Sequence, residues 1–212
     1  MGAEVDKLLR PLRDRPVVAW SIAALEKSGV VDSIVVVASE HNLEQLAALI
    51  EAVECALPVD LVLGGPRRQD SVGSAIHYLE LSDPEFVLVH DGARPLVPPE
   101  LLRAVLDAAR EHGAATAALP LKNACKEVDS HGFVRRSLER ASLVSVQTPQ
   151  AFRYQLLARA HREGLAHGAV VDDDAELVEL LGEPVKVVPG DYRNLKITTP
   201  DDLAAAEANL AS

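Results

Sequence analysis

The sequence predicts an α/β fold: a mostly parallel sheet with helices on both faces and a projecting β-arm. Between about residues 16 and 120, short β-branched segments alternate with amphipathic segments, which is the pattern of βαβ units. Of the 212 residues 48% are hydrophobic but only 3% are aromatic, so the core must consist mainly of aliphatic side chains. Such a core suits helices packed on a parallel sheet.

The first element is expected to be a helix over residues 16–27, with a proline in its first turn and Gly29 just past its end. No apolar β-segment precedes this helix, which is unusual for the class. The strands expected next are 33–39, 59–65, 86–89 and 114–120, and the helices between them are 43–53, 70–81 and 98–113.

The alternation ends after Pro120. Residues 125–139 contain two short, partly polar runs around Asp-Ser-His-Gly, which predict a hairpin. Its few apolar residues cannot form a core, so we expect an arm at about 122–146 within a single domain over 1–212.

The motif QTPQAF at 147–152 predicts a rigid turn, because Pro149 restricts the residue before it. The remaining expected elements are helices at 154–164, 174–181 and 201–211, a strand at 185–190 and an extended run at 194–200.

Charge and hydropathy exclude several classes of protein. A net charge of −11 argues against a protein that coats nucleic acid. No apolar run reaches the roughly 18 residues of a membrane span, and the start lacks a signal-peptide pattern. We therefore expect a cytoplasmic protein with no membrane or nucleic-acid partner. An anion would have to bind where positive charge is concentrated locally.

Polar, basic or glycine residues follow three expected strands, at 64–71, 90–95 and 193–200. In open α/β sheets, ligands bind at such carboxyl ends. Gly64 and Gly65 would let the backbone approach a planar ligand or a phosphate, and Ser71 lies near a helix N-terminus. An ordinary strand-to-helix turn explains the same residues.

Charged residues at the other two strand ends also allow two interpretations. Asp91 follows the apolar run FVLV, so it is expected either to bind Mg²⁺ together with substrate phosphates or to pair with Arg94. Lys196 is either a solvated charge or a phosphate ligand. The three consecutive acids at 172–174 are explained by capping of the helix that follows them.

Taken together, the motifs GGPRRQDSV, VLVHDGARP, QTPQAF and NLKITTPDDL resemble the 2-C-methyl-D-erythritol 4-phosphate cytidylyltransferases of the non-mevalonate isoprenoid pathway. The run DKLLRPLRDRPVVAWSI is similar to the family's second N-terminal block. The resemblance covers nearly the whole chain. It implies a Rossmann-like nucleotidyltransferase fold, a homodimer interlocked through the β-arm, Mg²⁺ as cofactor, and CTP and methylerythritol phosphate as substrates.

The resemblance also implies roles for individual residues. Lys7 and Lys196 would neutralise phosphate oxygens at the reacting centre, and Asp91 would bind Mg²⁺. The implied nucleotide-binding residues are Gly64, Gly65, Ser71 and Asp91, and the implied acceptor-binding residues are Arg140, Asp172 and Asp173, with Arg140 reaching the acceptor of the other subunit.

Three departures from the family pattern keep other functions open. Ala124 and Asp172 stand where the family has threonines, and Asp172 adds negative charge near an anionic acceptor. The family begins with an apolar strand and a Gly-rich loop, A-A-G-x-G-x-R-M-G, of which only Met1 and Gly2 match the end. The alternatives are a non-catalytic dimeric homologue and a cytidylyltransferase acting on ribitol 5-phosphate.

The missing strand and loop lead to two further expectations. Roughly 15–20 additional upstream codons would supply them. For the 212-residue chain itself we expect weak or no activity, because a strand edge would remain unpaired.

Overall fold

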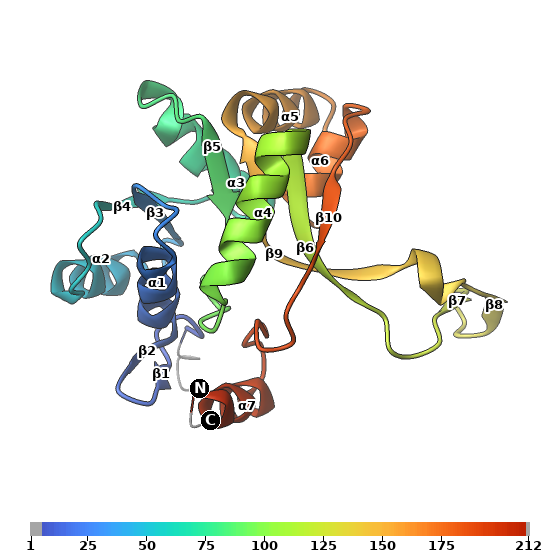
Figure 1. Ribbon diagram of the computed structural model, residues 1–212, viewed down its shortest axis with the longest axis horizontal. Helices are drawn as coiled ribbons and strands as arrows, with labels where there is room; N and C mark the ends of the chain where they lie inside the picture. Colours follow the sequence, from blue (N-terminus) through green and yellow to red (C-terminus); the bar gives the residue numbers. More distant parts are fainter. Residues whose placement is uncertain (1–5, 211–212) are drawn as a thin grey trace.

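The computed structural model describes residues 6–210, which form an α/β body and a β-hairpin arm (Figure 1). The helices are α1 Val17–Ser28, α2 Leu43–Ala52, α3 Arg68–Tyr78, α4 Pro99–His112, α5 Tyr154–Ala166, α6 Asp174–Leu180 and α7 Pro200–Asn209, with short 3₁₀ turns at Leu79–Leu81 and Arg140–Ser142. The strands are β1 Pro11–Leu12, β2 Arg15–Pro16, β3 Ile34–Ala38, β4 Val59–Leu63, β5 Phe86–Val89, β6 Ala114–Pro120, β7 Lys126–Val128, β8 Val134–Ser137, β9 Val144–Arg153 and β10 Lys186–Pro189.

The local signals locate the first helix well. Pro16 is the N-cap of α1, and Gly29 ends the helix in the left-handed conformation at φ +67°, which glycine adopts without strain. The polar start before α1 contains a two-stranded hairpin, β1–β2, that the sequence did not predict. It is held by the indole N–H of Trp20, which donates to the Leu12 carbonyl oxygen at 2.8 Å. Met1 and Gly2 lie outside the described residues.

The larger sheet has the order β10-β6-β9-β5. Strand β10 runs parallel to β6, but β9 is antiparallel to both β6 and β5. The expected turn at 147–152 is therefore wrong, since these residues lie inside β9 and most are buried. Pro149 is accommodated because the β6–β9 register shifts between Thr116 and Ala118, opposite the proline, so no ladder donor is required there.

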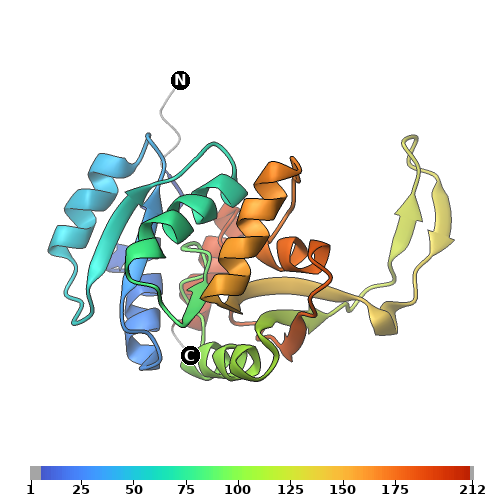
Figure 2. The same ribbon diagram turned by 90° about the horizontal axis from the view of Figure 1, so that it is seen from above.

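Helices cover both faces of this sheet, as Figure 2 shows for α4 and α5 on opposite sides. Alternate residues of β6 enter different clusters: Ala114 packs with α5 and α6, whereas Ala115 and Ala117 pack with α4. This alternation follows from the two-residue period of a strand. The expected aliphatic core is present, with Phe152 as its one fully buried phenylalanine among the described residues.

Strands β3 and β4 form a separate parallel pair. Within residues 6–210, β3 pairs only with β4 and β5 pairs only with β9, so the second edges of β3 and β5 carry no strand partner. A cavity of about 770 Å³ lies between them. For this reason the four apolar residues of β5, which precede Asp91, are only partly buried.

The expected hairpin is formed by β7 and β8, and Figure 2 shows it extending away from the body. Its tip residues Phe133 and Val134 are 72% and 61% exposed, so the described residues provide no core for them. No helix in the described part of the chain is both long and apolar enough to span a bilayer.

Candidate active site

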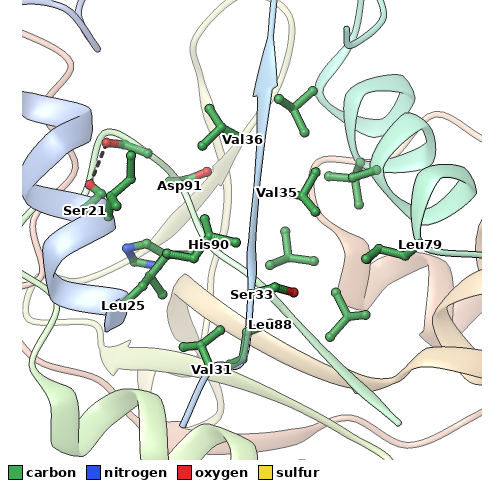
Figure 3. A pocket seen from close by; sticks show the side chains of 18 of the residues that line it. Ser21, Leu25, Val31, Ser33, Val35, Val36, Leu79, Leu88, His90 and Asp91 are labelled. Atoms are coloured by element: carbon green, nitrogen blue, oxygen red, sulfur yellow. Dashed lines mark hydrogen bonds between the residues drawn. The ribbon is translucent and has the colours of Figure 1, made fainter. Parts of the chain in front are cut away.

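Three loops meet at the carboxyl ends of the strands and line one end of the cavity. They contribute Arg68 and Ser71 at the start of α3, Asp91 after β5, and Lys196 from the segment between β10 and α7. Lys7 and the end of the loop at Gly92 line the same cavity, and Ser21 of α1 donates a hydrogen bond to the Gly92 carbonyl oxygen at 2.8 Å (Figure 3). The structure thus brings together Lys7, Ser71, Asp91 and Lys196, four of the residues singled out from the sequence.

Asp91 is the centre of a cluster of cations. Its Oδ2 lies 3.0 Å from the Lys196 ammonium and 3.2 Å from Nε of Arg94, and its Oδ1 lies 3.9 Å from Nε of Arg68. Burial opposes ionisation of this carboxyl, but the hydrogen bond and charge of Lys196, with the charges of Arg94 and Arg68, outweigh it and lower the pKa of Asp91. Both expected roles of Asp91 stay compatible, because the ion pair with Arg94 is present and Oδ1 is only lightly engaged.

The segment that carries Lys196 is anchored by buried polar contacts. The Ile197 amide donates to the Ala93 carbonyl oxygen at 2.8 Å, and Arg94 Nη1 donates to the Asn194 carbonyl oxygen at 2.8 Å. The fully buried Asn194 side chain donates to the Thr148 carbonyl oxygen at 2.7 Å. Contacts of Asn194 with Thr148 and with Arg94, about 50 and 100 positions earlier in the chain, thereby hold the Lys196 segment beside Asp91.

His90 supports the loop from behind. Its Nε2 faces the Arg94 carbonyl oxygen at 3.1 Å, so this nitrogen must carry the proton. Its Nδ1 then accepts from the Thr148 hydroxyl at 3.2 Å, and that hydroxyl accepts from the Asp91 amide at 3.0 Å. Burial among packed atoms lowers the pKa of His90 to about 4, although part of the ring faces the cavity. The ring is therefore neutral and orients the Asp91 backbone.

A buried pair that sequence reasoning missed lies behind Arg68. Asp174, whose side chain is 1% exposed, has Oδ1 3.0 Å from His161 Nε2 and Oδ2 2.8 Å from Arg68 Nη1. The Arg68 contact is a charge contact rather than an aligned hydrogen bond. His161 was not among the site residues expected from the sequence. The burial of His161 could have been predicted from its position on the apolar face of α5, which also carries Leu157 and Ala160.

The glycine turn is shaped by its own packing. A Cβ on Gly64 would lie 2.5 Å from Ser71 Oγ, and a Cβ on Gly65 would lie 2.5 Å from Asp70 Cβ. Ser71 Oγ donates to the Gly65 carbonyl oxygen at 3.3 Å. The two glycines are thus required for the turn to close on the start of α3, whether or not a ligand approaches.

The remaining expected site residues do not join the Asp91 cluster. Asp173 is the N-cap of α6 and accepts from the Glu176 amide at 3.0 Å, while the Asp172 amide donates to the Glu176 carboxylate at 3.1 Å. Capping therefore explains Asp173. Arg140 lies at the root of the arm and donates to the Lys122 carbonyl oxygen at 2.6 Å.

Comparison with known proteins covers the whole chain. Residues 1–212 match the family model described as 2-C-methyl-D-erythritol 4-phosphate cytidylyltransferase. A protein of that name from Pelotomaculum thermopropionicum is 46% identical over 210 residues, covering 98% of this chain and 87% of the relative. One from Dehalococcoides mccartyi is 42% identical over 207 residues, covering 98% and 88%.

Solved structures agree with these matches. The 2-C-methyl-D-erythritol 4-phosphate cytidylyltransferase of Thermus thermophilus superposes with a TM-score of 0.80 at 32% identity, covering 99% of this chain and 96% of that one. The 4-diphosphocytidyl-2C-methyl-D-erythritol synthase of Anaerococcus prevotii gives a TM-score of 0.88 at 29% identity, covering 97% and 93%. With its Rossmann-like nucleotidyltransferase fold, the chain belongs to the 2-C-methyl-D-erythritol 4-phosphate cytidylyltransferase family.

Proposed function

We propose that this protein joins CTP to 2-C-methyl-D-erythritol 4-phosphate, forming 4-diphosphocytidyl-2-C-methyl-D-erythritol and pyrophosphate. The observation that carries the proposal is the cluster around Asp91, where Lys196, Arg94 and Arg68 gather within 4 Å of one carboxylate in a protein of net charge −11. Such a local excess of cations suits a reaction between two polyanions. Family membership supplies the identity of those polyanions.

In the proposed reaction a phosphate oxygen of the acceptor attacks the α-phosphorus of CTP in line. A new P–O bond forms as the bond to the pyrophosphate leaving group breaks. The protein forms no covalent intermediate, so catalysis consists of positioning and charge neutralisation. Lys7 and Lys196 would neutralise phosphate oxygens, because both line the end of the cavity beside Asp91.

The residues at the site are compatible with Mg²⁺. The described residues contain no group of three or more His, Cys, Asp or Glu side chains that could hold a metal by themselves. Mg²⁺ commonly takes one or two carboxylates and completes its shell with substrate phosphates and water, so Asp91 alone is sufficient. Asp91 would hold the ion through its lightly engaged Oδ1. A bound Mg²⁺ would supply neutralisation of the triphosphate charge.

The remaining expected residues have proposed binding roles. Gly64, Gly65 and Ser71 would contact the cytosine and ribose, since this turn borders the cavity beside Arg68. Asp172 and Asp173 would lie near the acceptor.

A homodimer is proposed from the arm. Figures 1 and 2 show it projecting from the body, and its exposed Phe133 and Val134 would gain apolar contacts on a second copy. In such a dimer Arg140 would reach the partner's acceptor site. A cytoplasmic location is proposed because both substrates are soluble phosphates.

The experiment is a coupled assay of pyrophosphate release with CTP, Mg²⁺ and methylerythritol phosphate. Any release, including release at the weak rate expected for this chain, should require both substrates. Lys196→Met should lower the rate at least tenfold, whereas Lys186→Met, which removes an exposed lysine on β10 away from the cavity, should not change it. Ribitol 5-phosphate in place of methylerythritol phosphate tests the acceptor. No release with either acceptor would favour the non-catalytic homologue.

A further inference from the structure

The two lysines at the cavity are held in different ways. The Lys196 ammonium lies 3.0 Å from Asp91 Oδ2, whereas the Lys7 ammonium forms no ion pair within residues 6–210. The Lys7 side chain is also exposed. A lysine side chain has several rotatable bonds, so the position of this ammonium group depends on how firmly the backbone beneath it is held.

Asp6, the residue before Lys7, holds that backbone. Its Oδ1 accepts a hydrogen bond from the Leu8 amide at 2.9 Å, which closes a turn around Lys7. Its main-chain carbonyl oxygen accepts from the Leu9 amide at 2.9 Å. The Leu8 carbonyl oxygen in turn accepts from the amide of Val18, in the first turn of α1, at 3.0 Å. The backbone is therefore fixed on both sides of Lys7.

The second oxygen of the Asp6 carboxylate is held by Asn42, which is 5% exposed. Asn42 Nδ2 donates to Asp6 Oδ2 at 2.5 Å, and Asn42 Oδ1 accepts from the Ser39 amide at 2.8 Å. Asn42 is the N-cap residue of α2, but its side chain makes no capping hydrogen bond to that helix. Its oxygen and nitrogen serve Ser39 and Asp6 instead, so the side-chain amide cannot flip without losing both partners.

The anchored segment also packs against the loop that carries Asp91. A Cβ on Gly92 would lie 3.3 Å from Leu8 Cδ2, so the Leu8 side chain fills the space beside the residue that follows Asp91. Leu8 packs as well against the apolar cluster shared by α1, β3 and α2. Lys7 is thus fixed relative to Asp91, and both residues line the same cavity.

We propose that Asp6 and Asn42 are positioning residues for the reaction, because they hold the backbone that directs the Lys7 ammonium to phosphate oxygens beside Asp91. Neither side chain touches a substrate. The inference rests on the proposed function, which gives Lys7 its role. Lysine on a fixed backbone loses less conformational freedom when it engages a phosphate, and the gain is largest in the transition state, where charge develops on the phosphate oxygens.

Exchanging the two side chains tests this geometry. Asp6→Asn alone sets two amide nitrogens against each other, and Asn42→Asp alone sets two carboxylates against each other. The double variant Asp6→Asn/Asn42→Asp can form all three hydrogen bonds again, with the same net charge. We expect each single variant to lower kcat for pyrophosphate release at least fivefold, with the KM for CTP changed less than twofold. The double variant should recover at least half of the wild-type kcat.

Lys7→Met separates positioning from a general loss of structure. This substitution should lower kcat at least tenfold, and adding Asp6→Asn to it should change kcat less than twofold, because Asp6 acts through Lys7. Glu26→Ala is the matched control. It removes a carboxylate that accepts from the Ala56 amide at 2.6 Å, near the opposite end of α1, and should keep at least half of the wild-type kcat.

Amide exchange at Leu8, followed by NMR, gives a measurement that needs no turnover. It should be at least threefold faster in each single variant and return to the wild-type rate in the double variant. No pyrophosphate release by wild-type protein would overturn the proposed function itself, and the anchor would still be judged by the Leu8 exchange rate.

With active wild-type protein, four results would each overturn the positioning role. They are unchanged kcat in both single variants, a double variant no faster than the single ones, full activity of Lys7→Met, and a further fivefold loss when Asp6→Asn is added to Lys7→Met. Unchanged exchange at Leu8 in the single variants would overturn the anchor.

Discussion

Asp174→Asn is expected to destabilise the protein because Asp174 carries the negative charge of a buried pair. Its side chain is 1% exposed and lies between His161, which is 9% exposed, and Arg68, which is 33% exposed. The substitution keeps the volume and an acceptor oxygen but removes the charge. Arg68 and His161 would then face a neutral amide in a site that water hardly reaches.

The size of the effect follows from the geometry. A hydrogen bond to a charged group contributes about 1.5–3 kcal/mol, and breaking a buried ion pair costs about 3–5 kcal/mol. The lower end of each range applies here, because the Arg68 contact is not an aligned hydrogen bond and water can solvate the exposed part of the Arg68 side chain. We expect a loss of about 1.5–2 kcal/mol for Asp174→Asn and about 3 kcal/mol for Asp174→Ala. For a chain of this length about 2 kcal/mol corresponds to a Tm lower by about 4–8 °C.

Urea unfolding followed by circular dichroism at pH 7 measures this loss. The midpoint should fall while the slope of free energy against urea stays constant, which identifies a change in stability alone. Asp172→Asn is the matched control, because it removes an exposed carboxylate two residues away and should stay within about 0.5 kcal/mol of wild type. Since Arg68 lines the cavity, the KM for CTP should also rise in Asp174→Asn.

Two outcomes would refute the reasoning. Equal midpoints for Asp174→Asn and wild type would mean that the buried charge contributes nothing to stability. An equal loss in the Asp172 control would mean that the effect comes from the helix start rather than from the buried pair.

Three further results are expected. Stability should fall as pH drops from about 6.5 to 4, by at most about 3 kcal/mol, because burial lowers the pKa of His90 to about 4 and the unfolded state binds the extra proton in that window. Denaturation at pH 7, 5.5 and 4.5 checks this, and His90→Gln should flatten the slope; an unchanged slope would contradict it. Thr199→Ala removes the N-cap of α7, whose hydroxyl accepts from the Asp202 amide at 3.3 Å, and should cost about 1 kcal/mol in urea unfolding. Chelation by EDTA should stop pyrophosphate release, and Asp91→Asn should raise the Mg²⁺ concentration for half-maximal rate at least tenfold; an unaltered Mg²⁺ dependence would argue against this carboxylate as the ligand.

Much of the architecture could be predicted from local signals. Helix α4 begins at its proline and ends before Gly113, and β3 occupies the β-branched run of 34–38. The rule that ligands bind at strand ends also singled out the segments that contain Ser71, Asp91 and Lys196, and all three residues line one cavity. Helix caps, β-branched runs and polar strand ends each depend on a few neighbouring residues, so they can be recognised in the sequence alone.

Pairing across the sheet could not be read in this way. The motif QTPQAF has a proline in its middle, yet it lies in β9, between β5 and β6. Its place depends on a register shift opposite Pro149 and on pairing with residues 34 to 65 positions earlier in the chain. A local propensity rule cannot include such contacts.

The amino-acid sequence alone thus specifies the helices, several of the strands, the hairpin arm and the chemistry available at the strand ends, because these depend on neighbouring residues. Only the tertiary structure decides which of three adjacent acids is buried. Asp173 caps α6 while Asp174 turns inward, because His161 of α5 and Arg68 of α3 converge there. The tertiary structure likewise decides that the edges of β3 and β5 face one apolar cavity, since this depends on how α1, α3 and α4 pack around them.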